Sequence, residues 1–347
     1  MGGSVLATRG GEVQVHSSLV SDPALNVRTV QRQLAALLPE ARPTGDGEGT
    51  LELASSSTDA PRLISATVLE GGGPLRARRV FGEPISSFRG FLDGTQRSRV
   101  ALHLGGVPIV VGTVAAVVRE RRNRRMHTWG RPLVEACVYA ARSLVSPHSW
   151  DVLQTAYGAL LVDTSDGASD LAAHPIAIRD AAFHRVQARR ERLEQRLAER
   201  WCSTEHDRLF IDGGISGSDA AAVSSCTVGV VKTHRTLYAE GPALNVVLGL
   251  GYRERSSVFQ ITSPRRQTVA SWYLRFRDPA GHDPMWGLIR VEIAEPEPQD
   301  AHAIGDRADE VSRWILAEAS PLALPDARWD KMVYGIRDCE EFLRAIA

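Results

Sequence analysis

The chain has 347 residues, 43% of them hydrophobic, and its 41 basic residues balance 41 acidic ones. This length suits one large domain or two with a substantial core, and the composition excludes wholesale disorder and a histone-like polybasic protein. Lys232 and Lys331 are the only lysines, and this preference for arginine is explained more simply by biased codon usage than by a binding chemistry.

The cysteines and the amino terminus bear on the cellular compartment in which the protein is expected to work. Four cysteines lie far apart without a CxxC pair, so neither a zinc knuckle nor a dense disulfide framework is indicated. The amino terminus lacks a charged segment followed by an apolar run, and no stretch of about 18 apolar residues occurs. We therefore expect a soluble, cytoplasmic protein that is neither exported nor inserted in a membrane.

Residues 1–84 are predicted to form an amino-terminal extension that can contact a partner or the domain edge. Its elements are a short helix at 26–39, a loop rich in Gly, Ser and Pro at 41–60, and a strand at 63–73 that runs into glycines. The remaining residues, 85–347, are predicted to form the main domain.

A three-stranded antiparallel meander is predicted to open the main domain. The stretch FRGFLDGTQ at 88–96 is typical of a strand that ends in Asp-Gly-Thr, and RVALHL at 99–104 is typical of a second strand. The Val-rich run at 106–120 follows a Gly-Gly turn and supplies the third strand. A helical stretch is then predicted near 132–145.

The later elements alternate between helices and strands. Residues 178–201 contain no Gly or Pro and carry their apolar side chains on one narrow helical face, so a long helix is predicted. Strands are predicted at 208–212 and 224–232, followed by a helix at 242–251, a hairpin formed by 271–276 and 285–295, and helices at 307–318 and 336–346.

Asp93 and Asp212 each stand where a hydrophobic strand meets glycine. One interpretation is a turn that caps the strand, which is the commoner role of a single Asp-Gly. The other is that neighbouring strand ends bring the two carboxylates together. Mg²⁺ or Mn²⁺, hard cations that prefer oxygen ligands, would then relieve their repulsion.

Further candidates lie on the long helix predicted at 178–201 and at the end of the strand predicted at 224–232. At about 100° per residue, Glu194 lies about 60° from the centre of the apolar face and Glu191 about 120°, so Glu194 borders the buried face and is the candidate third ligand, with an ordinary solvated glutamate as the equal alternative. Lys232, or His234, could neutralise a phosphate at its strand end or simply face solvent. Converging carboxylates without His or Cys spacing favour phosphodiester hydrolysis by two metal ions.

The ordered motifs resemble one family. FLDGTQ, the Val-rich strand pair, the long helix, LFIDGGIS, GVVKTH and the paired strands SWYLRF and LIRVEI are similar, in order and spacing, to the NurA nucleases over residues 85–347. The resemblance implies an α/β fold with an RNase H-like core, in which helices flank a mixed sheet containing the meander. It also implies a homodimer and DNA cleavage that depends on Mn²⁺ or Mg²⁺, with two ions per site. The implied partner is a HerA-type hexameric ATPase, in DNA end resection or antiphage defence.

The resemblance also implies site residues. Asp93 and Asp212 match the family's two acidic strand ends, and Glu194 matches the helix glutamate between them. Lys232 matches a strand-end lysine. Asp330 aligns with the last metal ligand, although the stretch LALPDARWDKMVYGI departs from the family's usual Tyr-Pro form. The implied metal ligands are therefore Asp93, Glu194, Asp212 and Asp330.

An Arg-x-Glu motif and several arginine and aromatic residues supply further candidates. Arg290 and Glu292 correspond to a recurrent Arg-x-Glu that can be structural. Arginine clusters can bind phosphates, although such clusters are more often solvated surface, and aromatic rings can stack on bases. The alternation in SWYLRF favours core packing for at least one ring. The candidates for DNA contact are Arg119, Arg121, Arg122, Arg124, Arg125, Arg265, Arg266, Trp272, Tyr273 and Trp286.

Two other functions stay open. The Asp-Gly turns could cradle phosphate in an actin-like or sugar-kinase ATPase, although the sequence contains no P-loop motif. A non-catalytic adaptor with a degenerate nuclease core is the other alternative, and the departure at Asp330 is its best support.

Overall fold

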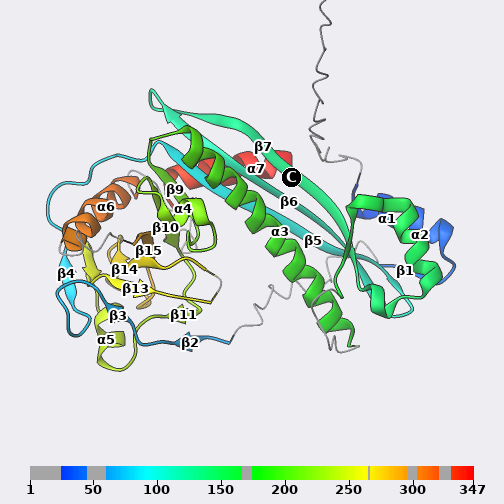
Figure 1. Cartoon of the computed structure of the whole chain (residues 1–347), viewed down its shortest axis with the longest axis horizontal. Coiled ribbons are helices and arrows are strands. Elements are labelled where there is room, and N and C mark those ends of the chain that lie inside the picture. Colours follow the sequence, from blue (N-terminus) through cyan, green and yellow to red (C-terminus); the bar gives the residue numbers. More distant parts are fainter. Residues whose placement is uncertain (1–24, 45–59, 166–173, 265, 296–302, 320–329) are drawn as a thin grey trace, which may run out of the picture.

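A mixed β-sheet with helices on both faces organises the protein (Figure 1). The computed structural model describes residues 25–44, 60–165, 174–264, 266–295, 303–319 and 330–347. Within these residues the sheet has 13 strands, and its main path runs β3-β13-β14-β15-β10-β9-β5-β6-β7-β8. The α/β class expected from the sequence is confirmed.

The helices and strands have the following bounds. The helices are α1 (Val27–Leu37), α2 (Pro147–Tyr157), α3 (Pro175–Thr204), α4 (Asp219–Val223), α5 (Pro242–Leu248), α6 (Ile304–Glu318) and α7 (Tyr334–Ile346), with 3-10 turns at Arg142–Leu144 and Gly158–Leu160. The strands are β1 (Ala41–Pro43), β2 (Arg62–Leu63), β3 (Thr67–Val68), β4 (Ala77–Arg79), β5 (Gly90–Leu104), β6 (Val107–Arg122), β7 (Arg125–Ala140), β8 (Leu161–Asp163), β9 (Leu209–Asp212), β10 (Thr227–Val231), β11 (Thr236–Leu237), β12 (Glu254–Ser256), β13 (Phe259–Ile261), β14 (Val269–Arg275) and β15 (Leu288–Ala294).

The predicted meander is present, but its strands are longer than expected. β5 takes in both of the first two predicted strands, so the chain does not turn after Asp-Gly-Thr. β7 supplies the third strand, and the helix predicted near 132–145 is wrong. All five residues from 136 to 140 are buried, because α3 covers one face of the strand and other elements cover the opposite face. A strand buried on both faces lacks the polar alternation that separates it from a helix in sequence.

Two parallel strands adjoin the meander. β9 pairs with β5 in parallel, with Leu92 opposite Ile211, and β10 pairs with β9 in parallel, with Val228 opposite Phe210. The predicted hairpin of β14 and β15 then extends the sheet, because β15 pairs antiparallel with β10. The short strands β9 and β10 end well before β5 does.

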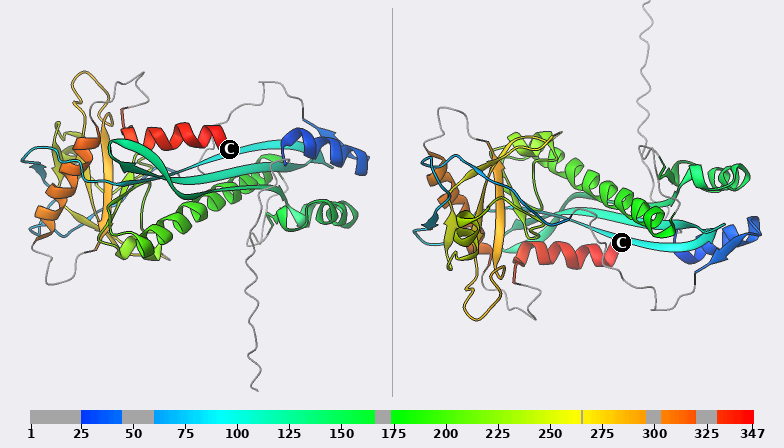
Figure 2. Two further views of the ribbon diagram at one scale, coloured as in Figure 1. Left: turned by 90° about the horizontal axis from the view of Figure 1, so that it is seen from above. Right: turned by 90° about the horizontal axis from the view of Figure 1, so that it is seen from below.

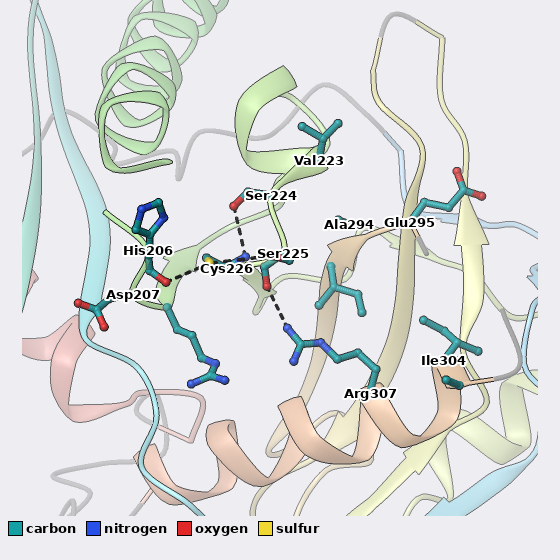
Figure 3. Close-up of a pocket in the computed structure, with 13 residues that line it drawn as sticks. His206, Asp207, Val223, Ser224, Ser225, Cys226, Ala294, Glu295, Ile304 and Arg307 are labelled. Carbon is teal, nitrogen blue, oxygen red and sulfur yellow. Dashed lines mark hydrogen bonds between the residues drawn. The ribbon is translucent and has the colours of Figure 1, made fainter. Parts of the chain in front are cut away.

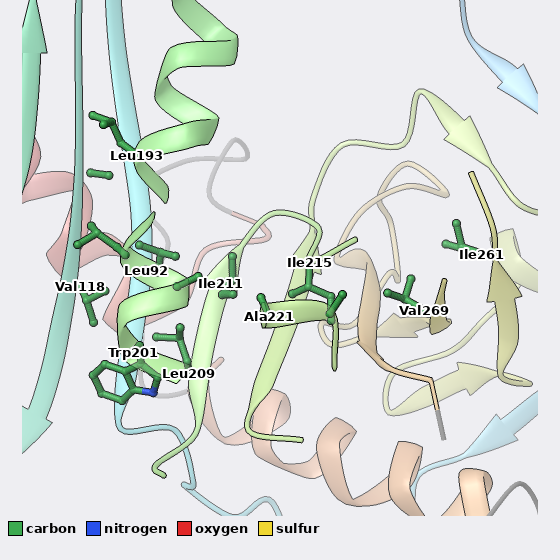
Figure 4. Close-up of a cluster of buried hydrophobic side chains, with 14 of the residues drawn as sticks. Leu92, Val118, Leu193, Trp201, Leu209, Ile211, Ile215, Ala221, Ile261 and Val269 are labelled. Carbon is green, nitrogen blue, oxygen red and sulfur yellow. The ribbon is translucent and has the colours of Figure 1, made fainter. Parts of the chain in front are cut away.

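The two faces of the sheet have separate cores. Leu92 and Ile211 face α3 and pack in a cluster with Leu193 and Trp201 (Figure 4). Their neighbours in sequence point to the opposite face, as the period of a strand requires, and pack with α6 and α7. Figure 2 shows α3 and α7 on opposite sides of the long strands.

The amino-terminal segment contributes strands at several places in the sheet. The predicted helix at 26–39 is confirmed as α1, where Asn26 Oδ1 accepts a hydrogen bond from Thr29 N at 3.1 Å. β1 pairs with β5, β3 with β13, and β4 with β12. The strand predicted at 63–73 is reduced to the two-residue strands β2 and β3, and most of the loop predicted at 41–60 lies outside the described residues.

In the part of the chain that the structure describes, no helix has the length and apolar content needed to cross a bilayer.

Candidate functional site

Asp93 and Asp212 lie side by side on adjacent strands. Leu92 is paired with Ile211 in parallel register, so the aspartates are the next residues along the two strands and project from the same face. Asp212 ends β9, as predicted. Asp93 does not end its strand, because β6 continues to pair with β5 as far as Leu104. The end of β9 beside the continuing β5 exposes both carboxylates to one space.

That space is a cavity of about 500 Å³ between the strand ends and α7. The strands β5, β9 and β10, with the residues that follow them, form one wall, and α7 forms the other. Arg190 reaches the cavity from α3. The side chains that matter below are Asp93, Thr95, Arg190, Asp212, Lys232, Glu340, Leu343 and Arg344.

The cavity concentrates negative charge around Asp93. Asp93 is 7% exposed, and its Oδ1 accepts a hydrogen bond from the Gly94 backbone N–H at 2.7 Å. Burial, and then the neighbouring charge of Asp212, raise the pKa of Asp93 well above its usual value, although Lys232 opposes the shift. Asp93 is therefore a carboxyl group that a further cation in the cavity would favour in its ionised form.

Lys232 is the cation that the protein places beside Asp212. Its Nζ donates a hydrogen bond to Asp212 Oδ2 at 2.8 Å, and both side chains are less than one fifth exposed. Burial opposes the charged form, but Asp212 and Asp93 outweigh it and raise the pKa of Lys232 above its usual value. The interpretation of Lys232 as a strand-end lysine in open solvent is wrong.

Glu194 lies on the other side of β5. A Cβ atom at Gly94 would collide with its carboxylate, so only glycine allows Glu194 to approach the strand at this point. Glu194 forms an ion pair with Arg190, one helical turn earlier, and lines a smaller cavity of about 160 Å³. Burial raises the pKa of Glu194 to about 7 despite that arginine.

Glu191 contrasts with Glu194. Its side chain is 41% exposed and accepts a hydrogen bond from Gln187 at 3.0 Å. It lines the same small cavity, but the helical angle that favoured Glu194 in the sequence corresponds to the deeper position in the structure.

Glu340 is a carboxylate of the main cavity that the sequence reasoning missed. It comes from α7, and burial raises its pKa, while the charges of Lys232 and Arg344 partly offset that effect. The buried face of α7 contains Ile336, Cys339 and Leu343. Glu340 borders this face, so the angular argument that selected Glu194 would also have selected Glu340.

Asp330 is placed outside the cavity lining. Its Oδ2 accepts a hydrogen bond from the Gly287 backbone N–H at 2.7 Å, and its carbonyl oxygen accepts one from Arg277 Nε at 2.6 Å. The segment that precedes α7 therefore fastens the turn between β14 and β15. The next residue, Lys331, donates to the carbonyl oxygen of Lys232 at 3.0 Å, so the two lysines of the chain are in contact.

The neighbouring candidates are structural in this arrangement. His234 is partly buried, with its Nε2 2.8 Å from the Leu288 carbonyl oxygen, and burial lowers its pKa to about 4. Arg290 donates to Glu292 at 2.6 Å, and Glu292 accepts from the Ile215 backbone N–H at 2.8 Å. Arg290 and Glu292 thus brace the loop that follows Asp212.

Most of the predicted DNA contacts are engaged within the protein. Arg119, Arg121 and Arg122 form ion pairs with Asp338, Glu318 and Glu120. Trp272 and Tyr273 are fully buried, and Trp286 stacks on His282 with ring centres 3.9 Å apart. Arg124, Arg125 and Arg266 are exposed, and Arg265 lies outside the described residues.

A second cavity, of about 670 Å³, lies at the other end of β9 and β10, where these strands begin (Figure 3). The guanidinium groups of Arg208 and Arg307 lie 4.1 and 4.7 Å from the ring centre of Trp314, and Arg307 donates to the Ser225 carbonyl oxygen at 2.9 Å. None of the candidate residues predicted from the sequence lines this cavity.

The donor chemistry of the main site suits a hard divalent cation, because carboxylate oxygens are its preferred ligands. Within the described residues, however, no three carboxylate, imidazole or thiol groups stand together as a ready metal site. Lys232 and Arg190 occupy the positions beside Asp212 and Glu194 instead. Comparison with known proteins found no matching family model and no similar curated protein.

Proposed function

We propose that this chain is a divalent-metal-dependent deoxyribonuclease with an RNase H-like core, of the kind that the resemblance to the NurA nucleases implies. The observation that carries the proposal is the in-register placement of Asp93 and Asp212 on adjacent parallel strands at one cavity. Two carboxylates held together in a partly buried site favour an added cation.

The strand order supports the RNase H-like core. The path β7-β6-β5-β9-β10 is an antiparallel meander whose first strand adjoins two parallel strands. The helix α3 connects the meander to β9, and α4 connects β9 to β10. This arrangement matches the mixed sheet with flanking helices that the resemblance implies.

Asp93 and Asp212 would hold the metal, with Glu194 and Glu340 as the nearest further carboxylates. Bound divalent ions supply an activated water and stabilise the leaving oxygen in phosphodiester hydrolysis. Lys232 presents a positive charge to the same cavity, where it can pair with a phosphate oxygen. Its present bond to Asp212 keeps that carboxylate oriented toward the cavity.

The test is cleavage of labelled single- and double-stranded DNA with Mn²⁺, with and without a cognate HerA-type ATPase. Asp93→Asn and Asp212→Asn should each reduce cleavage by about 10³-fold or more, as loss of a group that stabilises the transition state does. Glu191→Gln is the matched control, because Glu191 is half exposed, and it should cleave within a few-fold of wild type. Full activity in both aspartate variants would refute the assignment.

The proposed setting follows from the resemblance: a cytoplasmic homodimer that acts with the ATPase in end resection or antiphage defence. Light scattering of the purified protein tests the dimer. Co-elution with the ATPase, and a higher cleavage rate in its presence, test the partnership.

The adaptor alternative has its own support, because Lys232 and Arg190 already neutralise two of the carboxylates. Calorimetric titration separates the two proposals. Binding of Mn²⁺ that is lost in Asp93→Asn supports the nuclease, whereas no Mn²⁺ binding to the wild type supports an adaptor.

A further inference from the structure

β5 leaves the candidate site with one edge unpaired. β9 pairs with β5 only at 90–92, and β1 pairs with the same edge at 102–104, while β6 covers the other edge throughout. Between these points, residues 93–99 have no strand on that edge within the described ranges. Proteins usually cover such an edge or place charge along it.

The side chains on this part of β5 form a row that begins in the cavity. Asp93 and Thr95 line the cavity, and Arg97 and Arg99 follow on the same face because strand residues alternate. Same-face neighbours are about 6.8 Å apart along a strand. Arg97 and Arg99 are exposed, and neither has an acidic partner among the described residues.

α7 adds a further positive charge beside this row. Arg344, with a side chain 62% exposed, lines the cavity from the last turn of α7, where it pairs with Glu340 at 3.4 Å. Figure 2 shows α7 ending over the middle of the long strands, with α1 at their far end. The positive charges therefore begin at the cavity mouth and continue away from Asp93.

We propose that Arg97, Arg99 and Arg344, here called the β5 track, bind the phosphates of a single DNA strand that enters the cavity. This inference rests on the proposed function and specifies single-stranded DNA as the form of DNA that enters the site. Arginine forks match phosphate groups, and a single row of charges suits a single backbone. A cavity of about 500 Å³ has the size of a small-molecule site, which suits an unpaired strand better than an intact duplex.

The arginines at 119–125 provide the natural comparison. They lie at the turn between β6 and β7, beyond the start of β5, and three of them are held in ion pairs. Like Arg97 and Arg99, Arg124 and Arg125 at this turn are exposed, but these two predicted DNA contacts do not line the cavity. Substitution of either pair removes the same charge from the surface.

The experiment measures binding of fluorescein-labelled oligothymidylate to the full chain by anisotropy, in EDTA so that no cleavage occurs. Arg97→Ala/Arg99→Ala should weaken binding on the order of tenfold at about 0.1 M salt. The slope of log affinity against log salt should become shallower by about 1.4, the value for two lost contacts to a single strand. The matched control is Arg124→Asn/Arg125→Ala, since Asn tolerates the positive φ of 63° at Arg124. The control should retain both affinity and slope.

The outcomes separate this inference from the proposed function. The track is refuted if the wild type does not bind the single strand, if the control loses as much affinity, or if a duplex of equal length loses more affinity than the single strand. Binding with the expected losses, but without Mn²⁺-dependent cleavage by the wild type, would refute the nuclease and leave the track in place. Circular dichroism of both variants confirms that they are folded.

Discussion

A carboxylate lies on each face of β5 near Asp93 and Gly94, and the two carboxylates are neutralised by cations of different origin. On the α7 side, Asp212 is neutralised by Lys232, which comes from the end of another strand and has a side chain 18% exposed. On the α3 side, Glu194 is neutralised by Arg190 from its own helix, one turn away, with a side chain 22% exposed. The first pair depends on the tertiary fold, whereas the second can form in the helix alone. The first should therefore contribute more to folding and fail more severely when it is broken.

The largest expected stability effect comes from Lys232→Met. This change leaves Asp212 and Asp93 together without their buried cation, which should lower the free energy of unfolding by about 3 kcal/mol, the usual cost of orphaning one member of a buried pair. Urea denaturation measures the change.

The double variant Lys232→Met/Asp212→Asn is the control for this effect, because it removes both charges and keeps the shapes. It should recover at least about 1 kcal/mol relative to Lys232→Met. A double variant as unstable as the single one would show that Lys232 stabilises the fold through its packing and not through Asp212.

A second test uses His234, two residues after Lys232. Lys232 faces carboxylates and stays charged, whereas His234 lies near Lys331 and Arg290 and is held neutral, because burial lowers its pKa to about 4. Protonation must then accompany unfolding between pH 6.5 and about 4. Stability should be fully present above pH 6.5 and decrease as the pH falls through this window, by up to about 3 kcal/mol.

The measurement is the difference in unfolding free energy between wild type and His234→Gln across that pH window. The difference should shrink toward acid pH, because the variant has no imidazole to protonate and its amide can still donate to the Leu288 carbonyl. His127→Gln controls for loss of an exposed histidine. A difference that does not vary with pH would mean that His234 is already charged in the folded protein.

The sequence predicted the features that depend on local pattern. The long helix α3 followed from its periodicity, whereas the placement of Asp93 beside Asp212 was one of two interpretations of two similar strand motifs and was implied by the resemblance. The exact strand ends could not be predicted, because the length of β5 depends on β6 continuing beside it. The β7 error has the same origin, since burial on both faces removes the alternation that marks a strand.

The remaining site residues also divide into those that a local pattern predicts and those that depend on the tertiary fold. Glu340 was missed although the spacing of its buried neighbours indicates its position on α7, because the resemblance implies a last ligand at Asp330. Asp330 instead accepts a hydrogen bond from the backbone of the turn between β14 and β15, a long-range contact that no local sequence pattern predicts. Helical angles select which acidic residues border a core, but only the fold decides which of them share a cavity.

The smallest expected effect comes from Arg190→Met on the α3 side. Arg190 precedes Glu194 by four residues, the less favourable order for a helical ion pair, and its side chain is 22% exposed. Its loss should cost about 0.5 to 1 kcal/mol of stability, well below the effect of Lys232→Met. Because Arg190 borders both cavities, the same variant should change Mn²⁺ affinity more than it changes stability. Removal of the competing cation should make Mn²⁺ bind more tightly in a calorimetric titration, if Glu194 is a ligand. Weaker or unchanged Mn²⁺ binding, together with a stability loss as large as that of Lys232→Met, would show that the two sides of β5 do not differ as their geometry indicates.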